Sequence, residues 1–277
     1  ADGRPIVSIT DMSVRIGGLD RKAVEALWSR RRAAAAPPPE AGSVPAGPPM
    51  APLFDRRSIL AFAVGKPSEA FGEPYRVFDS ERVIARLPGP PYQFLDRIVD
   101  IRNARPFVLE AGAAVEAGYD VPPDAWYFRA NRQASMPFAV LLETALQPCG
   151  WLAAYLGSAL RSETDLSFRN LGGKAILHEE VFPDAGTLST RIKMTRVSQS
   201  AGMIIQNYDI EIRRGGRLVY EGDTYFGFFS KEALADQKGI LGVTPYSPTA
   251  EERARGAALP VTEAALADPG DPAEAPV

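Results

Sequence analysis

The fold is decided by one long apolar block at residues 136–160, MPFAVLLETALQPCGWLAAYLGSAL. Its large apolar side chains, such as Leu141 and Trp151, fall on every face of a helix. A helix that is apolar all round is buried inside a domain. Pro148 lies within the block and Gly150 follows it, so a kink or a weak turn is expected there.

Segments with strand character flank this block. Two precede it and four or five follow it, in the segments Phe94–Ile101, Phe107–Val115, Leu166–Leu171, Lys174–Val181, Thr187–Ser198, Met203–Arg213 and Arg217–Phe229. Gly215-Gly216 predicts a tight hairpin between the last two, and Gly172-Gly173 is expected to be a turn as well. Strands, a long buried helix and a run of antiparallel strands predict an α+β domain of the hot-dog class. In that arrangement a curved antiparallel sheet wraps around a long central helix.

Composition divides the chain into four parts. The main domain is expected at residues 52–235, between an Ala/Pro-rich linker at 31–51 and a second linker at 236–277. Residues 1–30 predict a strand and a helix capped by Asp20. We interpret them as the last strand and tail of a preceding hot-dog domain.

That interpretation depends on a short internal match. Asp2-Gly3-Arg4-Pro5 resembles Gly215-Gly216-Arg217-Leu218, where a Gly-Arg turn opens a strand, and a chance match is the alternative. The chain starts at Ala1 without an initiator Met, which predicts that it is a piece of a longer polypeptide.

The overall composition argues against several classes of function. The net charge of −3 gives no basic footprint for nucleic acid, and no apolar run reaches the roughly 18 residues of a membrane span. The single cysteine, Cys149, cannot form an internal disulfide or a zinc cluster. We therefore expect no metal site and a reducing, cytoplasmic location. Cys149 itself is expected to be a small buried core residue.

Histidine, like cysteine, occurs only once in the chain. The chain has one, His178, on a predicted strand beside Glu179 and Glu180, and we expect it at the surface. Any mechanism with a histidine base must use this residue or borrow a histidine from another polypeptide segment.

Two stretches resemble a known family. They are WYFRAN at 126–131 with MPFAVLLE at 136–143, and LSFRNLGG at 166–173 preceded by PCGWL at 148–152. Together they resemble the β-hydroxydecanoyl-thioester dehydratase family. They are more closely similar to dehydratase-type domains of bacterial polyunsaturated fatty acid synthases. PYQFLDRI at 91–98 resembles the opening strand of that family, and the resemblance covers about residues 55–235.

The resemblance implies a specific chemistry. In this family, a loop histidine and a helix carboxylate from opposite hot-dogs of a pair dehydrate a 3-hydroxyacyl thioester. One group removes the C2 proton and the other protonates the departing 3-hydroxyl. The first amides of the helix hold the thioester carbonyl. The substrate is carried on the phosphopantetheine of an acyl carrier protein, so no other cofactor is implied.

Most of the family's site residues have counterparts here. Glu143 matches the helix carboxylate, and Gln147 matches a glutamine one turn later. Phe138 matches the helix-start residue whose amide faces the thioester, and Met136 and Pro137 complete this substrate-binding step.

The histidine has no counterpart. Asn131 occupies its position, and counting back from Met136 reaches Arg129 instead. An asparagine amide cannot act as a base at neutral pH. The departure puts independent catalysis in doubt.

The leading hypothesis is a non-catalytic dehydratase-like half of a polyunsaturated fatty acid synthase. It would pair with an adjacent histidine-bearing hot-dog of the same multienzyme, receive substrate from acyl carrier protein and lend Glu143 as an acid. The alternatives are an active dehydratase or isomerase with a shared site, an acyl-thioesterase-type hot-dog using Glu143 with water, and a binding module for acyl carrier protein. A purely structural hydrogen-bonding role for Glu143 also stays open.

Overall fold

The computed structural model describes residues 22, 23, 26, 51–130, 134–200, 202–235 and 247–255. The chain divides into two units, residues 1–44 and 45–277. In the first unit Lys22, Ala23 and Ala26 are helical, where a helix is predicted after Asp20. The predicted strand at the N-terminus and the linker residues 31–50 lie outside the described residues, so the proposed division into domains stays a prediction.

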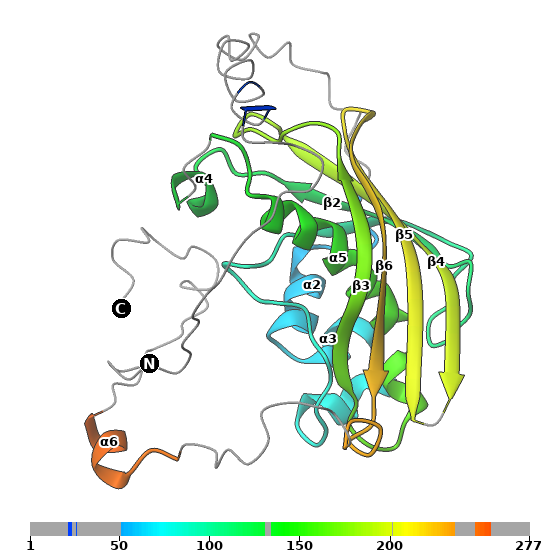
Figure 1. The fold of residues 1–277 in the computed structure, drawn as a ribbon. Helices are drawn as coiled ribbons and strands as arrows, with labels where there is room; N and C mark the ends of the chain where they lie inside the picture. Colours follow the sequence, from blue (N-terminus) through cyan, green and yellow to red (C-terminus); the bar gives the residue numbers. More distant parts are fainter. Residues whose placement is uncertain are drawn as a thin grey trace. The chain divides into compact units, whose positions relative to one another are not determined.

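The second unit is built on a six-stranded, wholly antiparallel sheet with the strand order β1-β2-β4-β5-β6-β3. Its strands are β1 Arg97–Arg102, β2 Ala114–Asp120, β3 Ser167–Leu177, β4 Thr187–Ser200, β5 Met203–Arg214 and β6 Arg217–Phe229. The sheet curves around one long helix, α5 (Phe138–Tyr155), as Figure 1 shows. This is the α+β hot-dog arrangement that the sequence predicts.

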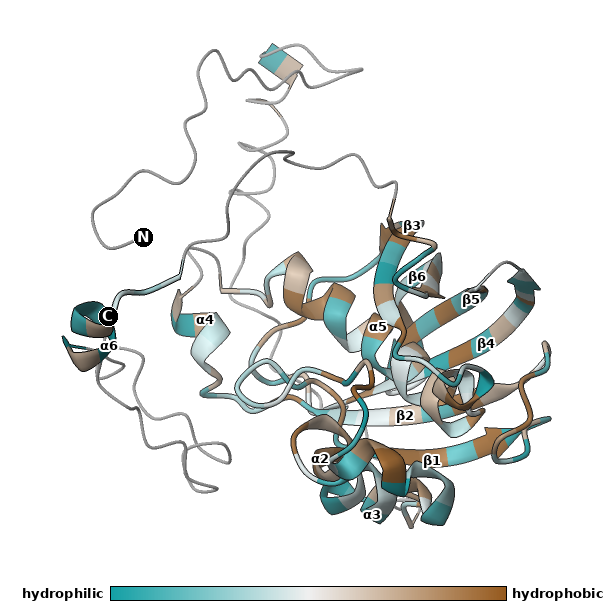
Figure 2. Ribbon diagram, turned by 90° about the horizontal axis from the view of Figure 1, so that it is seen from below, coloured by the Kyte–Doolittle hydropathy of each residue, from teal (hydrophilic) through white to brown (hydrophobic). Residues whose placement is uncertain are grey.

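Alternation along the strands explains why the sheet wraps the helix. Successive residues of β4 and β5 alternate between buried and more exposed positions, and Figure 2 shows the matching bands of apolar and polar residues. Successive side chains of a strand point to opposite faces, so one face of the sheet is apolar. That face packs on α5, which contacts β2, β4 and β5.

Helix α5 continues through Pro148. A proline lacks the amide hydrogen that would bond to the carbonyl four residues earlier, here that of Thr144. Thr190 of β4 donates its Oγ1 hydrogen to this carbonyl, at 3.4 Å. The sheet therefore supplies a partner to the carbonyl that the proline leaves without one, and the helix does not end there.

Two strand predictions were wrong. The second strand lies at Ala114–Asp120 rather than at Phe107–Val115, because Phe107 has a positive φ of 64° and belongs to a loop. Gly172-Gly173 is not a turn but part of the single strand β3, with a bulge between Asn170 and Gly172. A side chain at Gly173 would place its Cβ 2.3 Å from the Asp223 carbonyl oxygen. The glycine thus allows close pairing with β6. The hairpin at Gly215-Gly216 is confirmed, with φ values of 54° and 85°.

An N-terminal arm, residues 52–90, packs against one side of this fold. It contains α2 (Arg56–Ala63), α3 (Pro67–Phe71) and the 3-10 helix η1 (Glu73–Asp79), and α2 and α3 lie beside β1 in Figure 2. The ring of Phe54 lies 4.9 Å from that of Trp151, and Phe71 lies 5.8 Å from it. The hydroxyl of Tyr75 donates to the carbonyl of Ala154 in α5. The arm therefore fastens to the C-terminal half of the central helix.

The remaining described segment carries a short helix, α6 (Ala250–Arg255), inside the predicted C-terminal linker. Thr249 and Glu252 bond reciprocally to each other's backbone amides, at 3.1 and 2.9 Å, which is a capping box. Within the described ranges, no helix combines the length and apolar character needed to cross a membrane.

Candidate active site

Glu143 lines a cavity of about 610 Å³ that lies along one side of α5. The helix contributes Glu143, Leu146, Gln147 and Gly150, which recur at helical spacing and so form one stripe. Strands β3 and β6 supply the facing wall, including Phe168, Phe226 and Phe228, and residues 83–88 of the arm supply another. The cavity thus combines one carboxylate with largely apolar walls.

The Glu143 carboxyl is partly withdrawn from water. Burial raises its pKa, and a long hydrogen bond from Gln147 Nε2 to Glu143 Oε2, at 3.4 Å, opposes the rise. Desolvation disfavours the charged form of a carboxyl group. A carboxyl with a raised pKa keeps more of its proton at a given pH, as a general acid requires.

Gln147 is buried, and its side chain holds the backbone of residues 92–94 against α5. Its Oε1 accepts from the amide of Phe94 at 2.7 Å, and its Nε2 donates to the carbonyl of Tyr92 at 2.9 Å. Both ends of the side-chain amide are therefore engaged by backbone groups. A direct contact between Gln147 and substrate stays a prediction.

The three residues at the helix start lie apart from this cavity. Met136 is buried and its amide donates to the carbonyl of Val181 at 2.7 Å, while the Pro137 carbonyl accepts from Val140 and Leu141. Phe138 is exposed, with its ring 6.3 Å from that of Tyr220. None of Met136, Pro137 and Phe138 lines the Glu143 cavity. Their predicted role in substrate binding stays a prediction.

The first two amides of the helix are nevertheless available. Residues 138 and 139 are both exposed, and within the described parts of the chain their amides have no hydrogen-bond acceptor. Asn131, which occupies the family's histidine position, lies outside the described residues. The short helix α4 (Trp126–Ala130) ends immediately before it.

The one histidine, His178, lies outside the Glu143 cavity. His178 is exposed, and its Nε2 lies 3.1 Å from Oε1 of Glu221 on β6. It does not line the Glu143 cavity, which agrees with the expected surface position. Cys149 is fully buried, as expected for a core residue, and burial raises the pKa of its thiol.

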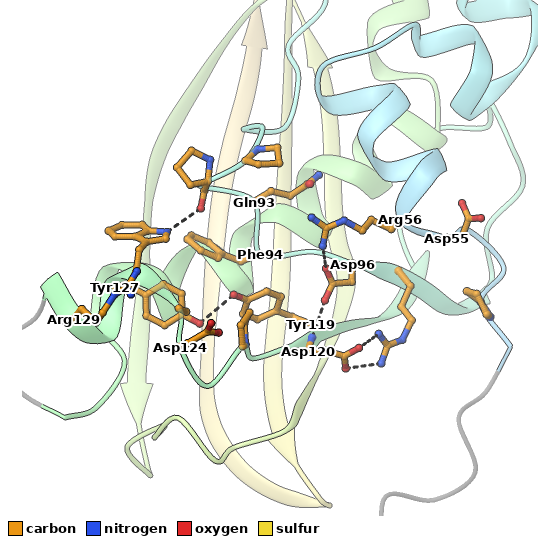
Figure 3. Close-up of a pocket in the computed structure, with 17 residues that line it drawn as sticks. Asp55, Arg56, Gln93, Phe94, Asp96, Tyr119, Asp120, Asp124, Tyr127 and Arg129 are labelled. Carbon is orange, nitrogen blue, oxygen red and sulfur yellow. Dashed lines mark hydrogen bonds and ion pairs between the residues drawn. The ribbon is translucent and has the colours of Figure 1, made fainter. Parts of the chain in front are cut away.

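A larger cavity, of about 870 Å³, lies at the β1 side of the sheet and was not anticipated from the sequence (Figure 3). Four of its charged groups form two ion pairs. Arg56 donates a hydrogen bond to Asp96 at 3.2 Å, and Arg97 donates two hydrogen bonds to Asp120, of 2.6 and 2.8 Å. These residues are far apart in the chain, so no local pattern marks them.

The buried groups of this second cavity are held in place by their neighbours. Burial raises the pKa of Asp96, and a hydrogen bond from the Asp120 amide opposes that rise. The hydroxyls of Tyr119 and Tyr127 lie 3.1 Å apart, and burial raises the pKa of both. This arrangement braces β1, β2 and α4. Among the described residues, no group of three or more His, Cys, Asp or Glu side chains could hold a metal ion.

The part of the chain that contains Glu143 and most of the curved sheet also matches a known protein family. The model of the FabA-like domain matches residues 87–223. Residues 87–223 form a FabA-like domain. The match includes α5 and all of β1 to β5, whereas almost all of the arm precedes it.

One curated relative of this FabA-like domain is a large polypeptide of the polyunsaturated fatty acid synthase of Thraustochytrium sp. It is 29% identical over an alignment of 192 residues that covers 66% of this chain. The chain spans only 13% of the length of that relative. The likeness therefore concerns one segment of a much longer protein.

Two solved structures match part of this chain. One protein of the dehydratase heterocomplex ApeI:P from Xenorhabdus doucetiae is 15% identical, with a TM-score of 0.40 over 53% of this chain and 89% of that chain. A thioesterase from Haemophilus influenzae is 16% identical, with a TM-score of 0.29 over 45% of this chain and 77% of that chain.

Proposed function

We propose that this FabA-like domain is one half of a 3-hydroxyacyl thioester dehydratase and supplies Glu143 as the acid of a shared site. The observation that carries the proposal is the position of Glu143. Its carboxyl lies, partly desolvated, in a mostly apolar cavity whose outer wall is the edge strand β3. An acid so placed could be reached by a second hot-dog that pairs along that strand.

The reaction needs a base as well as this acid. The base removes the proton from C2 of the 3-hydroxyacyl thioester, Glu143 protonates the departing 3-hydroxyl, and a C2–C3 double bond and water are formed. The proton then returns from the base to Glu143. Because His178 is paired at the surface, the base would come from a histidine-bearing hot-dog of the same multienzyme.

The edge strand supports pairing with such a partner. Phe168, Leu171, Ile176 and Leu177 of β3 are 41–54% exposed, and among the described strands only β6 pairs with β3. An unpaired strand with apolar side chains is a template for another strand. Acyl carrier protein would deliver the substrate, and no further cofactor is required by this chemistry.

The test measures dehydration by the pair. A FabA-like hot-dog that carries the family histidine is mixed with this chain and a 3-hydroxyacyl thioester, and formation of the 2-enoyl product is followed. We expect Glu143→Gln to lower the rate by about 10²–10⁴-fold, the usual contribution of a general acid. Glu110→Gln, at an exposed position outside the cavity, is the matched control.

Two outcomes contradict the proposal. One is a pair whose rate is unchanged by Glu143→Gln. The other is dehydration by this chain alone that disappears with His178→Ala, since the chain would then hold both groups itself.

A second candidate is thioester hydrolysis. It is favoured by the same observation of a carboxyl in an apolar cavity whose lining contains no histidine. Glu143 would then act on water as a base, and the product would be a free thiol. Thiol release by this chain alone, lost in Glu143→Gln, would favour this function over dehydration.

A further inference from the structure

One wall of the Glu143 cavity comes from the arm. Most of the arm precedes residue 87, where the FabA-like match begins. Phe62 and residues 83–86 line the cavity together with Leu87 and Pro88. All of them belong to the arm. The arm therefore supplies this wall, and neither the sheet nor the central helix does.

Leu87 lies against α5 beside Gly150, which is on the same stripe of the helix as Glu143. Gly150 follows Glu143 by seven residues on the same stripe, or about 10 Å at the rise of an α-helix. A Cβ added at Gly150 would lie 3.1 Å from Leu87 Cδ2. Leu87 therefore lies close against Gly150 and closes the cavity there, and even one methyl group at position 150 would crowd it.

Two arginines hold this wall in place. Arg86 donates to the carbonyls of Gly65 at 2.7 Å and Phe62 at 3.2 Å, which ties the segment to α2. Arg82 donates to the carbonyl of Ser162 at 3.0 Å and pairs with Asp165 at 3.2 Å, which ties it to the turn before β3. The same arginine lies 5.0 Å from the ring of Phe78. Hydrogen bonds from a charged group are stronger than those between neutral groups.

From this geometry we propose that the arm sets the length of the acyl chain that the Glu143 cavity accepts. Leu87, opposite Gly150, is the residue that determines the limit, and Arg82 and Arg86 are positioning residues that keep the wall rigid. The ligand class is an acyl thioester whose alkyl chain runs from Glu143 toward Leu87. The inference rests on the proposed function, because it takes the apolar part of the cavity as the place of the chain.

The experiment measures binding to this chain alone, since all the cavity's named walls belong to it. Pantetheine thioesters of saturated acids, from butanoyl to hexadecanoyl, are titrated by calorimetry into the wild type. Affinity is expected to rise with chain length and then to stop rising or fall. Leu87→Ala is expected to move that break to longer chains, with at least a tenfold gain for the first chain beyond the wild-type limit.

Two further variants keep the result interpretable. Leu109→Ala removes a leucine of similar burial that does not line the cavity, and it should leave the break where it is. Gly150→Ala adds one methyl group opposite Leu87 and should move the break to shorter chains. It tests the inference even if Leu87→Ala does not fold.

The possible failures are distinct. If the break is the same in Leu87→Ala, Gly150→Ala and Leu109→Ala, the role of the arm is refuted while the proposed function stands. If the folded wild type binds no thioester of any length, both the proposed acyl site and its length limit are refuted.

Discussion

The two edges of the six-stranded sheet are finished in different ways. At the β1 edge, the amides of Leu53 and Phe54 donate to the carbonyl of Ile98, and the Ile98 amide donates back to Phe54. The arm then covers this edge. At the β3 edge, every residue but one is exposed, and no described segment other than β6 pairs with the strand.

The difference shows at which edge of the sheet the described residues supply hydrogen-bond partners to the backbone, and at which edge they do not. An open edge exposes unpaired backbone groups and is usually blunted by charge, by bulges or by a cover. The β1 edge is covered. The β3 edge has a bulge at Asn170 and Gly172 but keeps a row of exposed apolar side chains. We therefore expect the β1 side to carry stability and the β3 side to carry association.

The largest effect is expected at the closed side. Trp151 is fully buried and contacts Phe54, Phe71 and Tyr155. Its replacement by alanine should lower the free energy of unfolding by about 3–5 kcal/mol, since it leaves a large cavity. Urea denaturation measures the change. Trp126→Ala, at a half-buried site in α4, should cost clearly less, and equal costs would contradict a special role of the arm's packing.

The next effect separates the two edges directly. Ile176 on β3 and Leu53 at the covered edge are 54% and 58% exposed. Ile176→Lys should weaken association with a histidine-bearing hot-dog at least tenfold, or about 1.4 kcal/mol, because an edge lysine opposes strand pairing. The free energy of unfolding should change by less than about 0.5 kcal/mol. Sedimentation of the mixed pair measures association.

Leu53→Lys is the matched control. It carries the same added charge at similar exposure, but at the edge that the chain covers itself, so association should not change. If both lysines weaken the pair equally, the effect is one of charge, and β3 is not the interface.

The smallest effect concerns the carboxyl on the open side. Burial raises the folded-state pKa of Glu143 above its unfolded value, so the folded state favours the protonated form. The contribution of this group to the free energy of unfolding is greatest below its unfolded pKa of about 4.3. The contribution is lost as the pH rises through the folded pKa.

Glu143→Gln should therefore be more stable than the wild type at neutral pH. The gain should be below about 1 kcal/mol, because the carboxyl is partly exposed and screened. It should disappear as the pH falls to about 4. Thermal unfolding of both proteins across this range measures it, with the exposed Glu110→Gln as control. A gain that is the same at every pH would show that burial of the charge is not its cause.

Much of the fold could be predicted from local pattern. The apolar block predicted α5, and the strand character of the segments between residues 187 and 229 placed β4, β5 and β6 to within two residues at each end. Gly172-Gly173 misled the prediction because a glycine pair is ambiguous in sequence. It marks a turn when the chain must reverse, and a close approach when another backbone lies against it. Only the position of Asp223 distinguishes the two cases.

The sequence by itself determined the central helix and the antiparallel sheet, since these follow from residue type and spacing. Glu143, and a histidine position held by Asn131, were predicted from the resemblance to a known family. Only the tertiary structure decided that the arm walls the Glu143 cavity, that Gln147 is held by backbone groups and that β3 is an edge strand among the described residues. Those features depend on contacts between residues distant in the chain, such as Leu87 with Gly150, and no local periodicity encodes them.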